Sequence, residues 1–342
     1  MAPWAFHVVM TEIKVFSTCP DSRAMRADAY PGRVAEVARW SEAAGCEGIL
    51  VYTDNAIVDA WLVSQLIVSA TVRICPLVAV QPAYMHPYSA AKMIASFAYL
   101  NGRRLYLNIV AGGFRKDLLA LGDGTPHDER YDRVVEYGQI VNALSHDKAV
   151  SFGGRYYSVR NLRMTPPVPR ELAPRLMVSG SSAAGLEAAR ALEAIAVKYP
   201  QRVDEEAEYP RPGVESGIRV GIVTREDGEE AWRVALERFP QDRQGQITHR
   251  YAMQVSDSEW HRHLSELAEL AVTEDNPYWL GPFQNYKTFC PYLVGSHERV
   301  AAELARYMRL GFGTFILDVP ASEEELDHIW IALEEAQSAL AS

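Results

Sequence analysis

The stretch GILVYTDNAIVDAWLVSQLIVSATVRICPLVAVQP, from Gly48 to Pro82, contains two short apolar runs separated by a longer amphipathic one. The runs Gly48–Thr53 and Arg73–Pro82 are apolar at most positions, which is typical of strands in a parallel sheet that is covered on both faces. The segment between them, Asp59–Thr71, has apolar residues at helical spacing and begins with Asp59, a favourable N-cap. The stretch therefore predicts a β-α-β unit.

The same alternation continues on both sides of this unit. Further strands are expected at Ile13–Thr18, Arg104–Gly112, Arg175–Gly180, Glu193–Tyr199, Ile218–Thr224 and Thr314–Pro320, and helices at Gly32–Gly45, His86–Leu100, Tyr131–Ser145 and Ala183–Leu192. Eight strands fit a closed barrel better than a doubly wound sheet, which usually has fewer. We therefore predict an α/β fold, a (β/α)8 TIM barrel with insertions, one of them a hairpin at Val150–Val159.

Two segments interrupt the alternation. The run from Pro200 to Gly213 is short and polar, so the barrel helix expected there should be stunted. Residues 239–294 form a long insertion within the single domain predicted for residues 1–342. Insertions of this length are usually functional lids or disordered, and its aromatic residues argue against disorder. It is expected to cap the barrel mouth or to contact another subunit; its aromatic residues are Trp260, Tyr278, Trp279, Phe283, Tyr286, Phe289 and Tyr292.

Composition narrows the classes of partner. The 342 residues include 34 Lys or Arg and 44 Asp or Glu, so the formal net charge is −10. Nucleic acid is not expected as a partner, because binding it requires clustered Lys and Arg. No segment reads as a membrane span or a signal peptide. The four scattered cysteines are expected to be reduced thiols in a cytoplasmic protein.

The ends of the predicted strands should form the active site, as in other barrels of this kind. Tyr52 and Asp54 follow the second strand, and we consider them, with His86, as candidates for proton transfer. The strand ends contain no Ser-His-Asp order, no HExxH and no paired-histidine pattern, so no metal site is predicted. The chemistry is therefore expected to come from a bound cofactor.

Two segments have the composition of a phosphate site. SGSSAAG, Ser179–Gly185, ends a strand and begins a helix, so its small residues and serine hydroxyls lie at an electropositive helix N-terminus. PHDERYDR, Pro126–Arg133, offers His127, Arg130 and Tyr131 at the start of another helix. Taken alone, this second segment is equally typical of a capped surface helix with i,i+4 charge pairs.

Three phrases resemble signatures of the bacterial luciferase-like flavin monooxygenases, in their order and spacing as well. They are GRRLYLNIVAGG (Gly102–Gly113), PHDERYDRVVEY (Pro126–Tyr137) and VSGSSAAG (Val178–Gly185). The phrases DAWLVSQLIVSATVRICPLVAVQP and GIRVGIVTREDGEEAWR resemble the alkanesulfonate monooxygenase branch most closely. The resemblance extends from Ile13 to about Leu326.

The resemblance implies a pocket for the FMN phosphate. Ser181 and Ser182, which follow Gly180, match the serines that contact the phosphate in this family, and His127 and Tyr131 match residues that complete the pocket.

The resemblance also implies residues beside the flavin ring and the substrate. Asn108 matches an asparagine that lies next to the isoalloxazine, where dioxygen or the flavin peroxide is held. Ala79 and Val80 match a strand end that lies against the ring, often with a non-proline cis peptide bond between the two residues. Arg219 matches an arginine near the substrate and the peroxide.

Several positions depart from the sulfonate enzymes. Their cysteine corresponds to Ala56, and their two histidines correspond to Gly221 and to Cys19 or Pro20. Their tyrosine falls at Val319 or Pro320, and their lid arginine falls in a segment whose only cation is Lys287. The flavin residues are kept while the substrate residues differ, so sulfonate cleavage is not expected. The acidic chain and the few cations at the barrel mouth favour a neutral or zwitterionic substrate.

The resemblance therefore implies an enzyme: an FMNH2-dependent, two-component monooxygenase. It would activate O2 as a flavin (hydro)peroxide and oxygenate a small organic molecule. Reduced FMN would come from a separate NAD(P)H:flavin reductase, because no nicotinamide-binding fingerprint is found. A homodimer or homotetramer is expected. The alternatives are an F420-dependent hydride-transfer oxidoreductase and a non-catalytic flavin-binding barrel.

Overall fold

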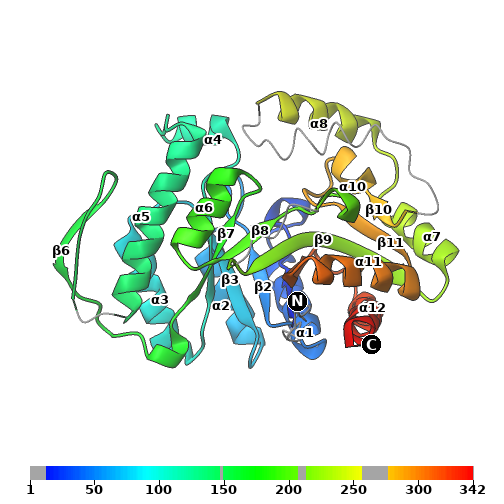
Figure 1. The fold of residues 1–342 in the computed structure, drawn as a ribbon, viewed down its shortest axis with the longest axis horizontal. Helices are drawn as coiled ribbons and strands as arrows, with labels where there is room; N and C mark the ends of the chain where they lie inside the picture. Colours follow the sequence, from blue (N-terminus) through cyan, green and yellow to red (C-terminus); the bar gives the residue numbers. More distant parts are fainter. Residues whose placement is uncertain (1–12, 147–148, 207–212, 256–275, 342) are drawn as a thin grey trace, which may run out of the picture.

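Eight parallel strands close into a barrel in the computed structural model, which describes residues 13–146, 149–206, 213–255 and 276–341 (Figure 1). In order around the barrel they are β1 (Lys14–Thr18), β2 (Gly48–Val51), β3 (Cys75–Val80), β4 (Tyr106–Val110), β7 (Arg175–Ser179), β8 (Ile195–Lys198), β9 (Ser216–Arg225) and β12 (Phe312–Leu317). The predicted (β/α)8 barrel is thus confirmed, with all eight strands at the expected places.

Two pairings close the ring. Strand β9 pairs in parallel with β8, where Lys198 lies opposite Ile218, and with β12, where Phe315 lies opposite the same residue. Strand β12 pairs in turn with β1. Neighbouring strands in the barrel are therefore neighbours in chain order, so the loops that follow all eight strands meet at one end.

Helices cover the outside of the barrel. The longer ones are α1 (Tyr30–Ala43), α2 (Ala60–Ala70), α3 (Pro87–Asn101), α5 (His127–His146), α6 (Ala183–Ala191), α11 (His297–Arg309) and α12 (Glu323–Ala341). The side chain of Asp59 accepts hydrogen bonds from the first turn of α2, as predicted, and His86 caps α3 in the same way. A short helix, α4 (Arg115–Ala120), follows β4, and single 3-10 turns lie at Ser22–Ala24, Arg170–Leu172 and Val203–Glu205.

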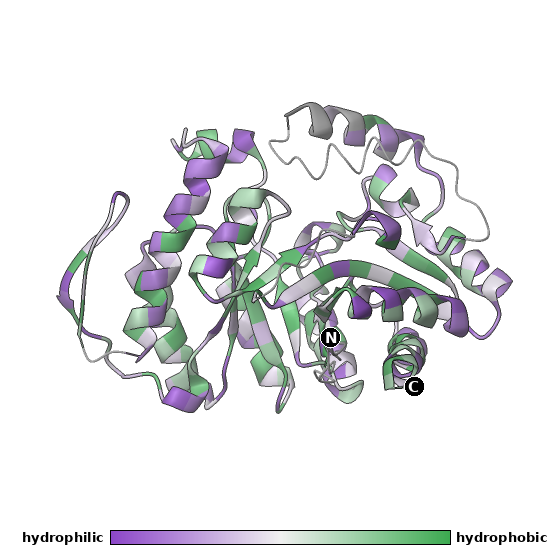
Figure 2. Ribbon diagram, in the orientation of Figure 1, coloured by the Kyte–Doolittle hydropathy of each residue, from purple (hydrophilic) through white to green (hydrophobic). Residues whose placement is uncertain are grey.

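Two apolar layers hold the barrel together. Residues that alternate along the strands point inward, where Phe16, Leu50, Leu77 and Tyr106 form a cluster, or outward against the helices. The strands are accordingly apolar along most of their length, whereas the helices carry polar residues on their exposed faces (Figure 2). No helix in the described part of the chain is long and apolar enough to cross a membrane.

The insertions add regular structure outside the barrel. The predicted hairpin forms from β5 (Val150–Gly153) and β6 (Ser158–Leu162). Strand β9 continues beyond the barrel, and its second half pairs with β11 (Tyr292–Ser296), which pairs with the two-residue strand β10 (Tyr278–Trp279). Helices α7 (Gly228–Arg238), α8 (Arg243–Val255) and α10 (Gly281–Gln284) complete this part.

The predicted insertion 239–294 is therefore partly a structured extension of the sheet. Trp279 and Tyr292 are buried in a cluster with Val223 and Ala231, so these two aromatic residues pack against β9 and α7. Trp260 lies outside the described residues. In the polar segment Pro200–Gly213, where a stunted helix was predicted, the described residues contain one 3-10 turn, and residues 207–212 are outside the described part.

Candidate functional site

A cavity of about 580 Å³ opens at the C-terminal ends of the strands. This volume lies within the range of about 300–1,000 Å³ common for ligand pockets. All but one of the residues that the resemblance assigned to the site line it, together with Tyr52 and Asp54: Tyr52, Asp54, Ala79, Asn108, His127, Tyr131, Gly180, Ser181, Ser182 and Arg219. Of the other candidates named from the sequence, His86, which caps α3, and Arg130 do not line it. Segments far apart in the sequence are thus brought to one place, as the barrel topology requires.

Val80 is the exception. Ala79 points into the barrel and lines the cavity, whereas the side chain of Val80 packs outward against the helices, since successive side chains of a strand face opposite ways. The next inward position, Gln81, lines the cavity again. The peptide bond between Ala79 and Val80 is trans, contrary to the cis bond that the resemblance implied. Only the backbone of Val80 remains a candidate for the site.

One side of the cavity is a turn around the N-terminus of α6. Ser182 caps this helix, and its hydroxyl accepts a hydrogen bond from the backbone N–H of Gly185 at 3.2 Å. A Cβ at Gly180 would fall less than 3.0 Å from the hydroxyl of Tyr131, so only glycine lets the turn approach this hydroxyl. The ring of His127 meets that of Tyr131 edge-on at 5.4 Å. Hydroxyls and a helix N-terminus therefore converge there.

Asn108 lies next to this turn, on β4. The hydroxyl of Ser179 donates a hydrogen bond to Oδ1 of Asn108 at 2.8 Å, and the asparagine is buried. This bond occupies the oxygen of the side chain and fixes the amide plane. The Nδ2 group is therefore the end of the amide that can donate to a ligand.

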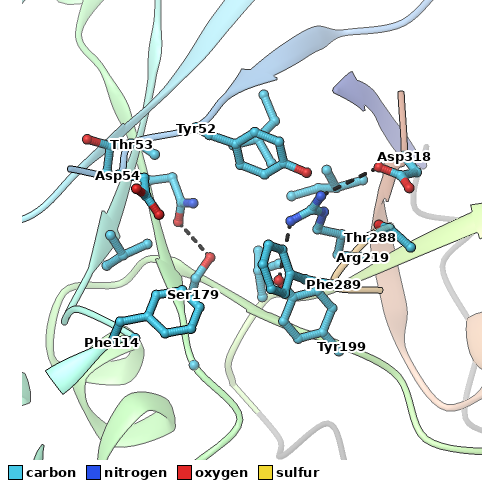
Figure 3. Close-up of a pocket in the computed structure, with 18 of the residues that line it drawn as sticks. Tyr52, Thr53, Asp54, Phe114, Ser179, Tyr199, Arg219, Thr288, Phe289 and Asp318 are labelled. Carbon is cyan, nitrogen blue, oxygen red and sulfur yellow. Dashed lines mark hydrogen bonds and ion pairs between the residues drawn. The ribbon is translucent and has the colours of Figure 1, made fainter. Parts of the chain in front are cut away.

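The opposite side of the cavity is built around Arg219, which is only 7% exposed on β9 (Figure 3). The guanidinium lies 4.6 Å from the centre of the Tyr52 ring and donates to the hydroxyl of Tyr199 at 3.3 Å. Its Nη2 atom is 3.6 Å from Oδ1 of Asp318, which follows β12. Among the described residues, Nε and Nη2 of Arg219 find no hydrogen-bond partner although both are buried.

Tyr292 holds Asp318 from behind. Its hydroxyl donates to Oδ2 of Asp318 at 2.8 Å, and burial raises the pKa of Tyr292 well above its ordinary value, so it stays a donor. The ring of Tyr292 lies over Gly221, its register partner, where any Cβ would come closer than 3.0 Å. The glycine that departs from the sulfonate enzymes thus makes room for this tyrosine.

The charges that line the cavity are balanced in pairs. Each Lys or Arg among the lining residues has a carboxylate at ion-pair distance: Arg23 with Asp21, Lys198 with Glu206, Arg219 with Asp318, Arg238 with Glu325 and Lys287 with Asp242. Two further lining carboxylates, Asp54 and Asp117, have no such partner among the described residues. Burial, and secondarily the charge of Asp54, raises the pKa of Asp117.

Aromatic side chains border the mouth. Phe289, from the insertion, has its ring 6.1 Å from that of Phe114 and 5.7 Å from that of Tyr286, and all three line the cavity. Asp54, in contrast, mainly shapes its own turn, since its Oδ1 accepts from the backbone N–H of Ala56 at 2.8 Å.

Two partners of Arg219 escaped the list of predicted site residues. Asp318 and Tyr199 stand at predicted strand ends, so their presence at the mouth could be inferred, but not their contact with Arg219. The sequence pointed to Tyr292 only as one of the aromatic residues of the insertion. Its contact with Asp318 could not be inferred, because its place depends on the pairing of β11 with β9.

Comparisons with known proteins agree with the resemblance. A family model described as luciferase-like monooxygenase matches residues 11–314. The 4-(gamma-L-glutamylamino)butanoyl-[BtrI acyl-carrier protein] monooxygenase BtrO of Niallia circulans is 38% identical over 300 residues, which cover 86% of this chain and 88% of that protein.

Solved structures of low sequence identity share the fold. The EDTA monooxygenase from Chelativorans sp. BNC1 is 14% identical with a TM-score of 0.72, over 97% of this chain and 94% of the other. An F420-dependent secondary alcohol dehydrogenase is 17% identical with a TM-score of 0.64, over 95% and 99%. None of these three relatives singles out the alkanesulfonate branch.

Proposed function

Because the chain belongs to the luciferase-like monooxygenase family, we propose that it uses reduced FMN and O2 to oxygenate a small organic molecule in the cavity at the barrel mouth. It is an oxidoreductase of the monooxygenase class. The proposal concerns the cofactor, the division of the cavity and the substrate.

The contact between Gly180 and Tyr131 carries the cofactor assignment. At Gly180 the absence of a side chain lets the turn approach the hydroxyl of Tyr131. The turn also presents a helix N-terminus and the hydroxyls of Ser181 and Ser182, and these groups together suit a phosphate dianion. The residues present therefore fit FMN, with its phosphate at this turn and its ring toward Ala79 and Asn108.

The remaining lining residues divide the work. Bound reduced FMN supplies the electrons that activate dioxygen. Asn108 donates from Nδ2 to an oxygen atom beside the ring, with its plane held by Ser179. Phe114 and Phe289 exclude water from the mouth, which limits wasteful release of peroxide. Arg219, on the far side, orients the substrate.

The proposal includes two partners of the chain: a source of reduced flavin and further copies of the chain itself. A separate NAD(P)H:flavin reductase delivers FMNH2, and the barrel forms a homodimer or homotetramer. We assign the lid role of the insertion to Tyr286, Lys287 and Phe289, which are among its residues that line the cavity.

The substrate class follows from the relative that is 38% identical. Its name specifies an acyl group carried by an acyl carrier protein. We extend this to the present chain: the substrate is an acyl chain delivered as a thioester, whose reacting carbon enters the cavity. An enzyme assay should then give product from the carrier-bound acyl chain and little from the free acid.

Anaerobic mixing with FMNH2, followed by admission of oxygen in a stopped-flow instrument, tests the core of the proposal. We expect an absorbance transient that differs from both free reduced and free oxidised flavin and that outlives the oxidation of free FMNH2. Oxidation at the rate of free flavin, together with tight F420 binding in a parallel titration, would contradict it and favour hydride transfer.

The variant Asn108→Leu tests the role of the Asn108 side chain as a hydrogen-bond donor. It keeps the volume of the side chain and removes the donor, so FMN binding should persist while the lifetime of the transient falls, on the order of 100-fold as for other single-donor deletions. An unchanged lifetime would remove Asn108 from the proposed site.

A further inference from the structure

The ion pair of Arg219 and Asp318 is incomplete. Their closest N–O distance is 3.6 Å, whereas a charge-assisted hydrogen bond between such groups has about 2.7–2.9 Å. Nε and Nη2 of Arg219 are buried and have no hydrogen-bond partner within the part of the chain that the structure describes. Buried donors are rarely left unsatisfied, so an arrangement of this kind points to a ligand that completes it.

The surroundings hold the two groups apart. The guanidinium is placed against the ring of Tyr52 at 4.6 Å and next to Tyr199, with the ring centre at 5.7 Å. Asp318 is fixed from the other side by the hydroxyl of Tyr292. A positive and a negative group therefore face the cavity side by side, with donors and acceptors to spare (Figure 3).

The balance of charge selects the ligand. A simple anion would gain attraction from Arg219 but would be repelled by Asp318. The cavity lining also includes Asp54 and Asp117, which have no ion-pair partner among the described residues. A simple cation would be attracted by Asp318 but repelled by Arg219. A group that carries an ammonium and a carboxylate on one carbon can satisfy both members of the pair at once.

We propose that Arg219 and Asp318 bind the α-amino-acid head of the substrate. The carboxylate accepts from Nε and Nη2 of Arg219, and the ammonium donates to Oδ1 of Asp318. The inference rests on the proposed function in one respect: it assigns the substrate to the half of the cavity opposite the flavin. Tyr292 is then a positioning residue, which keeps Asp318 from closing on Arg219.

Calorimetric titration of the full chain with L-glutamine tests the inference, because the side chain of this amino acid is neutral and only its head is charged. The analogues N-acetyl-L-glutamine and 4-aminobutanamide lack the ammonium and the carboxylate, respectively. We expect L-glutamine to bind at least about tenfold more tightly than either, equivalent to about 1.4 kcal/mol. Equal affinity for all three would overturn the inference.

Variants assign the two charges. In Asp318→Asn the preference over N-acetyl-L-glutamine should fall to near unity, and in Arg219→Gln the preference over 4-aminobutanamide should do so. Tyr292→Phe, which keeps the buried ring, should weaken the first preference without loss of folding. Asp242→Asn removes a carboxylate from another pair at the cavity, with Lys287, and should change neither. Preferences that survive in both site variants would contradict the assignment.

A separate FMN titration keeps the two proposals distinguishable. Binding of FMN without a preference for L-glutamine would overturn the inference alone. A preference for L-glutamine without binding of FMN would support the amino-acid site and contradict the cofactor assignment.

Discussion

Gly221 and Tyr292 are packed against each other, and the packing requires that position 221 has no side chain. The ring of Tyr292 is fully enclosed and occupies the space that a Cβ at position 221 would need. The hydroxyl of the same tyrosine holds Asp318, which faces Arg219. The small residue Gly221 on β9 thus helps to determine the position of the charged group of Asp318, directly after β12.

Gly221→Ala should therefore destabilise the protein. The added methyl group collides with a ring that cannot move away, and overpacking of this kind costs about 1–3 kcal/mol. Gly32→Ala is the matched control, since Gly32 is exposed in α1 with open space around it, and alanine should stabilise that helix by about 0.5–1 kcal/mol. Chemical denaturation measures both. A neutral Gly221→Ala would show that the ring is not held as described.

Substitution of Tyr131 should change the affinity for FMN but not for riboflavin, which lacks the phosphate. If its hydroxyl contacts the phosphate, Tyr131→Phe loses a hydrogen bond to a charged group, worth about 1.5–3 kcal/mol, or roughly a tenfold to hundredfold loss of FMN affinity. Riboflavin affinity should not change. Tyr137→Phe is the same substitution on the same helix, at a buried hydroxyl that has no hydrogen-bond partner in the described segments, and should leave the affinity for both flavins unchanged. Equal losses for both flavins would place the phosphate elsewhere.

The sequence identified site residues where chemistry and position coincide. Ser181 and Ser182 were found because small and hydroxyl residues end a strand and begin a helix, and Asn108 and Arg219 because the resemblance marked them. The contacts of Asp318 with Arg219 and with Tyr292 were not predicted, because they arise only when β11 and β12 are placed on either side of β9. Tertiary proximity of this kind leaves no local pattern.

Among the elements, the barrel strands were predictable and the added ones were not. Strands buried on both faces are continuous apolar runs, which can be recognised in the sequence. Strand β10 has two residues, too few for any periodicity, and β11 lies in a stretch whose aromatic content suggested a cap. The insertion divides into residues that pack against β9, such as Trp279, and residues that reach the cavity, such as Phe289.

Helix α8 should loosen at low pH through His249. Its ring packs on Phe283 of α10 at 4.6 Å, and burial lowers the pKa of His249 below its ordinary value. In the unfolded segment the histidine takes up a proton first as the pH falls below about 6.5. The stabilisation is therefore fully present above that pH and is lost as the pH falls through the lowered folded-state pKa.

Hydrogen exchange of the α8 and α10 segments, corrected for intrinsic rates, measures this effect. Protection should fall between pH 7.5 and pH 5.5 in the wild type. His249→Phe keeps an aromatic ring on Phe283 without a titratable group, so its protection should be insensitive to pH over this range. An equal fall of protection in the variant would assign the effect to another group.

At the scale of the whole molecule, charge and apolar surface are distributed unevenly. The chain carries a net charge of −10, and its cavity neutralises every lining cation with a carboxylate. Six of the twelve large apolar side chains that are exposed among the described residues lie on α2 or α3 or within two residues of their ends: Val58, Leu62, Val72, Tyr88, Tyr99 and Leu100. Exposed apolar side chains that gather on one region mark an interface in many proteins.

The α2–α3 face should therefore be the contact between protomers of the proposed homo-oligomer. Leu62 and Tyr99 are 66% and 74% exposed, so Leu62→Glu combined with Tyr99→Glu would place four charges in a two-fold interface without disturbing the core of either protomer. Light scattering coupled to size exclusion should then report a shift towards the monomer mass. Leu236→Glu, at an exposed leucine of α7, should keep the wild-type mass. A wild-type monomer, or dissociation by Leu236→Glu alone, would place the interface elsewhere or remove it.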